Sequence, residues 1–176
     1  SKIKFNKIIK SISDIKPVEG RLESIGNIKN NSKVILDYAH TPDALKYTLE
    51  SIKEQFSHSS ISIVFGCGGN RDKDKRPIMG KIANQYCNKI FLTDDNPRYE
   101  NPKKIRNQIK KKIVRSKLVE IASRKKAIKV SIENLNSGDI LLVAGKGHEI
   151  YQEYRGKKKN FSDKKCILKE INSKNK

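Results

Sequence analysis

The sequence of 176 residues contains no tryptophan, only three cysteines and no long run of apolar residues. No apolar stretch approaches the ~20 residues that a membrane-spanning helix needs, so the sequence predicts no contact with a membrane. Cys67, Cys87 and Cys166 form no C-x-x-C pair and have no histidine at metal-ligand spacing, which argues against a zinc site. Sparse cysteines without an apolar leader are typical of a reducing cytoplasm, where we expect this protein.

Acidic residues are also scarce, since 19 Asp and Glu stand against 39 Lys and Arg and the formal net charge is +20. Such a charge fits nucleic acid, an anionic surface or an anionic substrate. Only eight of the basic residues are arginines, and the lysines are spread along the whole chain. Aromatic residues are not interleaved with basic ones, as they are in platforms that stack single strands. We therefore interpret the charge as a solvated surface and predict no nucleic-acid partner; a basic nucleic-acid-binding module is the alternative.

Short apolar segments alternate with helical patterns of about a dozen residues. Strands are predicted at 21–28, 33–39, 60–66, 89–94, 118–121 and 139–145, and helices at 41–56, 76–87, 101–114 and 123–135. The chain then predicts a hairpin over 149–163, turning at 156–159, and a closing helix over 162–171. This alternation indicates an α/β fold, a Rossmann-like doubly wound and mostly parallel sheet with a C-terminal hairpin and closing helix.

The first residues have a different pattern. Apolar residues at mostly helical spacing in 1–15 stop before "PVEGR". Residues 1–19 are therefore predicted to be a lead-in helix and linker. Residues 20–176 are predicted to form one domain, because a chain of this length is too short for two generous cores.

Polar clusters follow four of the predicted strands: "LDYAHTPD", "FGCGGNRDKDKRP", "TDDNPR" and "VAGKGHE". The ligand crevice of an open α/β sheet lies past the carboxyl ends of its strands, so these clusters should meet there. Arg71 and Arg98 could each hold a carboxylate through two hydrogen bonds. Asp95, Asn96 and Glu149 could hold an ammonium group. The predicted pocket suits a zwitterion such as an amino acid with more than one carboxylate; a set of surface ion pairs is the alternative.

Neither glycine-rich segment fits a known phosphate-binding loop, although backbone N–H groups at Gly66, Gly68 and Gly69 could face an anion. The pattern G-x-x-x-x-G-K-[ST] is absent from the sequence. Arg71 stands where G-x-G-x-x-G needs its last glycine, and His148 stands where a Walker hydroxyl would be. If this chain uses ATP, it must hold the phosphates in another way.

Five segments, "GRLE", "DYAHTPDAL", "FGCGGNRDKDKRPIMG", "TDDNPR" and "AGKGHEIYQ", occur in the order and spacing found in Mur ligases. Over about residues 18–170 the chain resembles the C-terminal domain of the MurE group of that family. The resemblance implies an ATP-dependent ligase of peptidoglycan synthesis, which joins meso-diaminopimelate to UDP-N-acetylmuramoyl-L-alanyl-D-glutamate through an acyl phosphate. In this family a central domain with a Walker-type loop holds ATP and Mg²⁺. The resemblance therefore implies the amino-acid-binding C-terminal domain, with residues 1–19 as the end of the central domain, and this part alone should be inactive. We expect it to be a monomer.

The resemblance also implies roles for individual residues. The substrate-binding residues would be Arg71, Asp95, Asn96, Pro97, Arg98, Gly145 and Glu149, and the ATP contacts made on domain closure would be Arg21, Asp37 and His40. No catalytic residue and no metal ligand is expected within this sequence.

The sequence departs from the family pattern at two positions. Asn70 stands where an Asp is common before Arg71, which removes one charge and could alter the ordering of the loop. Lys164 follows "FSD" where Arg is more usual. Family members selective for L-lysine usually lack an arginine at the position of Arg98, because lysine has no second carboxylate. Arg98 therefore favours diaminopimelate, and a ligase domain for another acceptor such as L-lysine is the alternative.

Overall fold

A computed structural model of the chain describes residues 18–26 and 28–175. The strands are β1 (Glu23–Ser24), β2 (Lys33–Asp37), β3 (Ile61–Phe65), β4 (Lys89–Leu92), β5 (Leu118–Glu120), β6 (Ile140–Ala144), β7 (Tyr151–Tyr154) and β8 (Lys157–Asn160). The helices are α2 (Pro42–Gln55), α3 (Lys75–Tyr86), α4 (Pro102–Lys110), the short 3-10 helix η1 (Arg115–Lys117), α5 (Arg124–Glu133) and α6 (Asp163–Lys174). None of the helices in these two ranges is long and apolar enough to cross a membrane.

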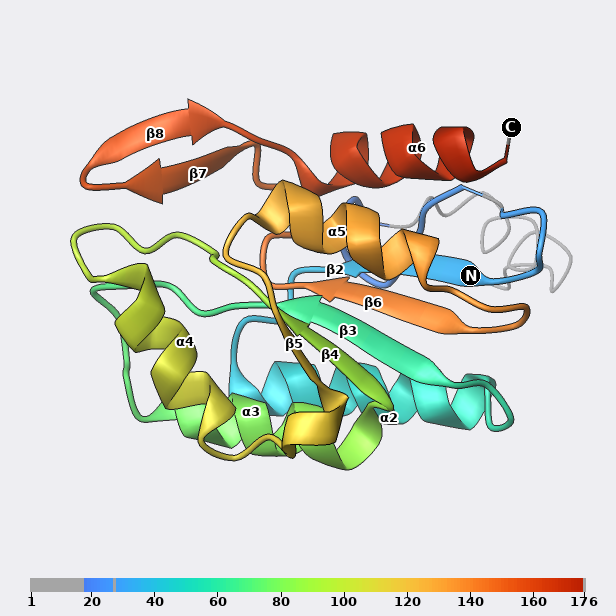
Figure 1. Cartoon of the computed structure of the whole chain (residues 1–176), viewed down its shortest axis with the longest axis horizontal. Coiled ribbons are helices and arrows are strands. Elements are labelled where there is room, and N and C mark those ends of the chain that lie inside the picture. The colour runs from blue at the N-terminus through green and yellow to red at the C-terminus, as the bar shows by residue number, and fades with distance from the viewer. Residues whose placement is uncertain (1–17, 27, 176) are drawn as a thin grey trace, which may run out of the picture.

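Six strands form one sheet in the order β1-β2-β6-β3-β4-β5, and β7 pairs with β8 in a separate hairpin (Figure 1). All neighbours in the large sheet are parallel except β1, which runs antiparallel to β2. The predicted fold class is therefore confirmed, including the C-terminal hairpin and the closing helix. The lead-in helix predicted for residues 1–15 lies outside the described residues.

Alternate side chains of each parallel strand pack on opposite faces of the sheet. Helices α2, α3 and α4 cover one face, and α5 and α6 cover the other (Figure 1). On β6, Ile140 and Leu142 pack with the first layer, while Leu141 and Val143 pack with the second. This is the period-two geometry of a strand. Because both faces are covered, the central strands read as continuous apolar runs.

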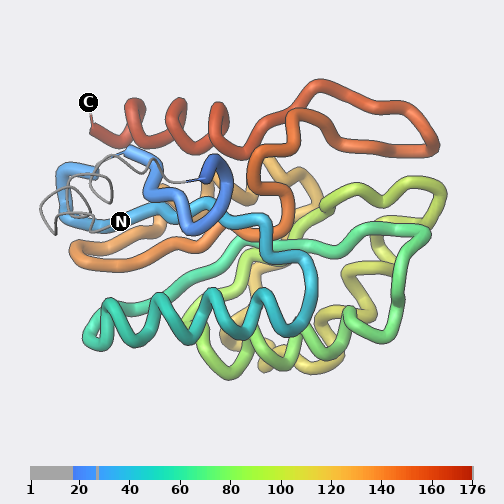
Figure 2. The backbone as a smooth tube through the Cα atoms, turned by 180° about the vertical axis from the view of Figure 1, so that it is seen from behind, coloured from blue at the N-terminus to red at the C-terminus, as the bar shows by residue number. Residues whose placement is uncertain are grey.

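The path of the chain brings four loops to one place. From β2 the chain passes through α2 to β3, continues to β4 and β5, and returns through α5 on the opposite face to β6, which lies between β2 and β3 (Figure 2). The carboxyl ends of β2, β6, β3 and β4 are therefore neighbours, with a reversal of strand order between them. Ligands of such sheets bind at this kind of reversal. The four loops that follow these strands carry the four polar clusters of the sequence.

The predicted helix starts depend on local caps. The Thr41 hydroxyl accepts a hydrogen bond from the Ala44 N–H at 3.3 Å, and Pro42 occupies the first turn. Asn101 caps α4 in the same way, and Ser162 caps α6. These side chains satisfy N–H groups that have no partner within the helix. The caps place the helix starts close to the strand-end loops.

Two predicted elements are shorter in the structure. The strand predicted at 21–28 reduces to Glu23–Ser24, because the backbone at Leu22 and Gly26 has positive φ, 42° and 64°, and leaves the extended region. The helix predicted at 101–114 ends at Lys110. Beyond it the Val114 N–H donates to the side-chain oxygen of Asn84 on α3 at 2.9 Å, which holds the chain outside the helix.

The hairpin turns one residue earlier than predicted. Arg155 and Gly156 both have positive φ, 51° and 73°, as a two-residue turn of type I′ requires. The three lysines at 157–159 therefore belong to the outer strand β8, where they are exposed. Lysines on an edge strand discourage pairing with other chains.

A fully buried ion pair links the two helices of one layer to the sheet. The Arg124 guanidinium donates to both carboxylate oxygens of Asp163, at 2.8 and 2.7 Å, and to the Ala144 carbonyl at 2.9 Å. Neither side chain is exposed. Burial alone would lower the pKa of Arg124, but the charge and hydrogen bonds of Asp163 raise it above its ordinary value. The pair joins the first turns of α5 and α6 to the end of β6.

Asp163→Asn should lower the free energy of unfolding by about 3–5 kcal/mol, because a buried guanidinium would lose its counter-charge. The matched control is Glu133→Gln, since Glu133 pairs with Lys129 at 3.8 Å on the exposed face of α5. Glu133→Gln should lower the free energy of unfolding by only about 0–0.5 kcal/mol. Urea denaturation of the parent and both variants measures the difference. Equal losses of stability in the two variants would show that the contribution of the Arg124–Asp163 pair to stability does not depend on its burial.

Candidate functional site

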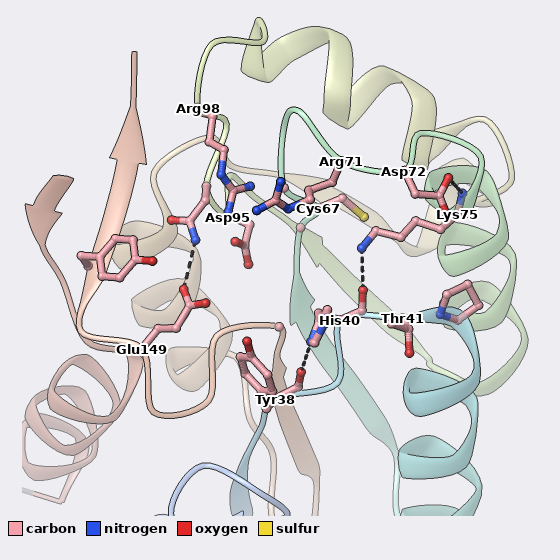
Figure 3. A pocket seen from close by; sticks show the side chains of 16 residues that line it. Tyr38, His40, Thr41, Cys67, Arg71, Asp72, Lys75, Asp95, Arg98 and Glu149 are labelled. Carbon is pink, nitrogen blue, oxygen red and sulfur yellow. Dashed lines mark hydrogen bonds between the residues drawn. The ribbon is translucent and has the colours of Figure 1, made fainter. Parts of the chain in front are cut away.

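A cavity of about 510 Å³ opens at the carboxyl ends of the four central strands (Figure 3). This volume is in the range of small-molecule sites. Among the residues that line it are His40 from the loop after β2, Arg71 from the loop after β3, Asp95, Asn96 and Arg98 from the loop after β4, and Gly145 and Glu149 from the loop after β6. Six of the seven predicted substrate-binding residues thus line one cavity. Pro97 does not; it is buried, and its carbonyl oxygen faces Gly69.

The glycine loop after β3 and the loop after β4 contact each other through their backbones. A Cβ atom added at Gly69 would lie 1.9 Å from the Pro97 carbonyl oxygen, and one at Gly66 would lie 2.2 Å from that of Thr93. The Gly69 N–H donates to the Asn96 carbonyl at 2.8 Å. These glycines are therefore required for close approach, and the N–H of Gly69 is not free to bind an anion.

Arg98 has a left-handed backbone, with φ of 51°, which is uncommon for a residue other than glycine. The hairpin of β7 and β8 holds it there: the Arg98 N–H donates to the Glu153 carbonyl at 3.0 Å, and the N–H of Arg155, in the turn, donates to the Arg98 carbonyl at 2.6 Å. The guanidinium donates through Nη1 to the Gly69 carbonyl at 2.9 Å, and its Nε lies 3.5 Å from a Glu153 carboxylate oxygen. The side chain extends toward Arg71 and Asp95 (Figure 3).

Asn96 and Glu149 belong to a network centred on Lys146. The Asn96 side-chain amide donates to a Glu149 carboxylate oxygen at 3.0 Å. The Lys146 ammonium donates to that same oxygen at 2.7 Å and to the side-chain oxygen Oδ1 of Asn96 at 3.1 Å. Burial raises the pKa of Glu149, but the hydrogen bond and charge of Lys146 outweigh it, so the pKa is lowered. Glu149 is therefore a carboxylate at neutral pH.

Asp95 and Gly145 are adjacent at the floor of the cavity. A Cβ atom at Gly145 would lie 3.0 Å from Asp95 Oδ2, and the φ of Gly145 is 110°, so this position requires glycine on two grounds. The same Asp95 oxygen lies 3.8 Å from Nη1 of Arg124. That Nη1 is one of two buried side-chain nitrogen or oxygen atoms in the described residues without a hydrogen-bond partner. Asp95 thus has a buried positive charge behind it.

Asn70 keeps the glycine loop ordered without the charge of an aspartate. Its side-chain oxygen accepts a hydrogen bond from the Tyr99 N–H at 3.1 Å, and its own N–H donates to Glu100 at 2.6 Å. An amide oxygen accepts as a carboxylate oxygen does. Its φ of 53° is one that Asn tolerates better than most residues. Arg71, which follows it, is exposed and points into the cavity (Figure 3).

The three residues expected to contact a nucleotide line a second cavity of about 320 Å³. Arg21 is exposed and its guanidinium lies 5.4 Å from the centre of the Tyr38 ring. His40, also exposed, lines both cavities. Asp37 is buried, and its carboxylate accepts from the N–H groups of Leu22 and Ala39, each at 2.8 Å. Asp37 therefore connects the loops that carry Arg21 and His40.

No group of three or more His, Cys, Asp or Glu side chains in the part of the chain that the structure describes could hold a metal ion.

The sequence is similar to those of known proteins. The family model described as "Mur ligase, glutamate ligase domain" matches residues 20–147. The chain belongs to the Mur ligase family. Among curated proteins, it is 49% identical over 166 residues to the UDP-N-acetylmuramoyl-L-alanyl-D-glutamate–2,6-diaminopimelate ligase of Rickettsia felis, which covers 94% of this chain and 31% of that protein. The ligase of the same name from Chlorobaculum tepidum is 44% identical over 160 residues, 90% of this chain and 32% of that protein.

Solved structures show the same fold. A structure of a UDP-N-acetylmuramoyl-L-alanyl-D-glutamate–2,6-diaminopimelate ligase matches with a TM-score of 0.82 and 37% identity, covering 97% of this chain and 35% of that one. A folylpolyglutamate synthase of Mycobacterium tuberculosis matches with a TM-score of 0.64 at 14% identity, over 81% of this chain and 33% of that one, which shows the fold alone. The chain spans about a third of the length of the curated relatives it matches.

Sequence reasoning missed the buried cations around the cavity. Lys146 and Arg124 have no exposed side-chain surface, and neither does Arg76, which donates to both Glu100 carboxylate oxygens at 2.9 Å. Arg76 also donates to the Gly68 carbonyl at 3.0 Å and so fixes the glycine loop. A long basic side chain is exposed by default, and only the folded structure identifies these exceptions.

Glu100→Gln should flatten the fall in stability at acid pH. Hydrogen bonds from Arg76 are the main cause that lowers the pKa of Glu100 from 4.5 to about 2. Because the folded-state pKa is depressed, the carboxylate stabilises the fold fully above about pH 4.5, and this contribution is lost as the pH falls toward 2. Thermal unfolding at several pH values between about 5 and 2 measures how steeply the stability falls. The control Glu54→Gln, on the exposed side of α2, should retain the parent's slope; an unchanged slope in Glu100→Gln would contradict the prediction.

Proposed function

We propose that this domain binds the acceptor amino acid of a diaminopimelate-adding Mur ligase. The supporting observation is that Arg71 and Arg98, from neighbouring loops, face the same cavity as Asp95 and Glu149 (Figure 3). Two guanidinium groups can receive two carboxylates, and the acidic groups can receive ammonium. meso-Diaminopimelate carries two of each. The relatives that are 44–49% identical are named for this amino acid.

Within this proposal each residue has a part. Arg71 grips one carboxylate, Arg98 holds the second, and Glu149 with Gly145 receives the far ammonium group. Asp95 and Asn96 contact the ligand from the loop after β4, with Pro97 fixing the turn. The domain thereby orients the attacking amino group toward the activated D-glutamate carboxylate of UDP-N-acetylmuramoyl-L-alanyl-D-glutamate. Such orientation accelerates a reaction without a local base, by proximity and electrostatic preorganisation.

ATP fits this proposal as a ligand held mainly by another part of the ligase, together with Mg²⁺. ATP would supply the activation of the glutamate carboxylate. The exposed Arg21 and His40 can reach a nucleotide that approaches the second cavity, and Asp37 holds their loops in place. We accordingly propose that this chain has no turnover of its own. The proposed setting is the cytoplasm, with a monomeric ligase and no nucleic acid.

Calorimetric titration of this chain with meso-diaminopimelate and L-lysine tests the proposal. The parent should bind diaminopimelate more tightly than lysine, because lysine has no second carboxylate for Arg98 once Arg71 holds the first. Arg98→Ala should lower the affinity for diaminopimelate by about 10–100-fold, which is the contribution of a charge-assisted hydrogen bond. The affinity for lysine should change little.

Arg115→Ala is the matched control, because Arg115 is exposed in η1 and does not line the cavity. It should leave both affinities unchanged. Equal losses of the two ligands in Arg98→Ala would argue for a different acceptor.

A further inference from the structure

Lys146 is a charged side chain with no exposed surface, located directly behind the cavity. Its ammonium contacts Glu149 at 2.7 Å and Asn96 at 3.1 Å, and lies 5.6 Å from the centre of the Tyr151 ring. All three of these residues line the cavity, whereas Lys146 does not. It therefore cannot touch a ligand, yet it contacts three groups that can.

A lysine is costly to bury, and a buried lysine is retained where its charge has a partner. Glu149 is that partner, and its side chain is 20% exposed, so one side faces Lys146 and the other faces the cavity. Lys146 takes one carboxylate oxygen, Oε2, which also receives the Asn96 amide. Two donors on one oxygen fix the orientation of the carboxylate.

Other charges around Glu149 are weaker influences. Arg98, from the loop after β4, lowers the pKa of Glu149 through space, after the larger effects of burial, Lys146 and Asn96. Arg124, on α5, also senses the charge of Glu149, but its hydrogen bonds go to Asp163 and Ala144. Lys146 is thus the one cation in direct contact with Glu149 among the ion pairs of the described residues.

We propose that Lys146 is a positioning residue that keeps Glu149 charged and oriented, so that the cavity receives an ammonium group equally well from mildly acidic to mildly alkaline pH. The proposal rests on the proposed function for the identity of the ligand, and its first test needs no ligand. Without Lys146, burial would dominate, and Glu149 would take up a proton as the pH falls.

The first test is a carbon-13 NMR titration of the Glu149 carboxyl group in the parent and in Lys146→Met, with the signal assigned through Glu149→Gln. In the parent the midpoint should lie below 4.5, and in Lys146→Met it should rise by about one pH unit or more. A smaller rise would overturn the proposal. The control Lys129→Met removes a lysine from an exposed pair with Glu133 and should leave the Glu149 midpoint unchanged.

A second variant applies if Lys146→Met folds poorly. Lys146→Met combined with Glu149→Gln removes both charges, so it leaves no unpaired buried carboxylate. The double variant should be more stable than Lys146→Met alone. If it is equally or less stable, Lys146 acts through packing and the proposal fails.

The third test measures the affinity for meso-diaminopimelate by calorimetry between about pH 5.5 and 8. The affinity of the parent should change little, whereas that of Lys146→Met should fall by about twofold or more at about pH 5.5, because a Glu149 midpoint raised to that pH leaves half of the carboxyl groups protonated. A flat profile in Lys146→Met would overturn the proposal. If the parent binds no diaminopimelate at any pH, the proposed function loses its support, and the NMR titration still decides the role of Lys146.

Discussion

Two segments of backbone contact each other with no side chain between them where the loop after β3 meets the loop after β4. The approach of Gly69 to the Pro97 carbonyl leaves no space for a methyl group. It also permits the hydrogen bond from Gly69 to Asn96 and the return bond from the Arg98 guanidinium to Gly69. The spacing of Arg71 and Arg98 across the cavity follows from this contact. Glycine is needed here for closeness rather than for a left-handed backbone.

Behind the cavity, each of three charged groups that line it has a partner of opposite charge. Glu153 lies behind Arg98, Lys146 behind Glu149 and Arg124 behind Asp95. These partners come from β7, from the loop after β6 and from α5. Side chains held in this way lose little orientational freedom when a ligand arrives, and they do not need to reorganise as charge develops. The geometry of the site therefore depends on β7 and α5 as well as on its four loops.

The sequence predicted the central strands, the helix starts and the edge of the sheet that carries the cavity, because these depend on local patterns. The helix caps Thr41 and Asn101 can be recognised in the sequence from the residues next to them. It did not predict the short β1 or the early end of α4, since the latter depends on Asn84 in another helix. It also missed Lys146 and Arg124. Their burial depends on partners distant in sequence, such as Asn96 and Asp163, which no local pattern identifies.

The left-handed backbone of Arg98 and its two hydrogen bonds, one to Glu153 in β7 and one from Arg155 in the turn that follows, tie the hairpin to the loop after β4. Gln152 and Tyr154 add side-chain bonds to the same loop, to the carbonyls of Asp94 and Asp95 and to the Asp94 carboxylate. If this loop recognises the acceptor as proposed, the smallest transferable unit of that recognition is two segments distant in sequence. A loop with the sequence "DNPR", transferred alone into another ligase, would lack the hydrogen bonds from the hairpin that fix its backbone. Strand β7 would therefore have to be transferred with it.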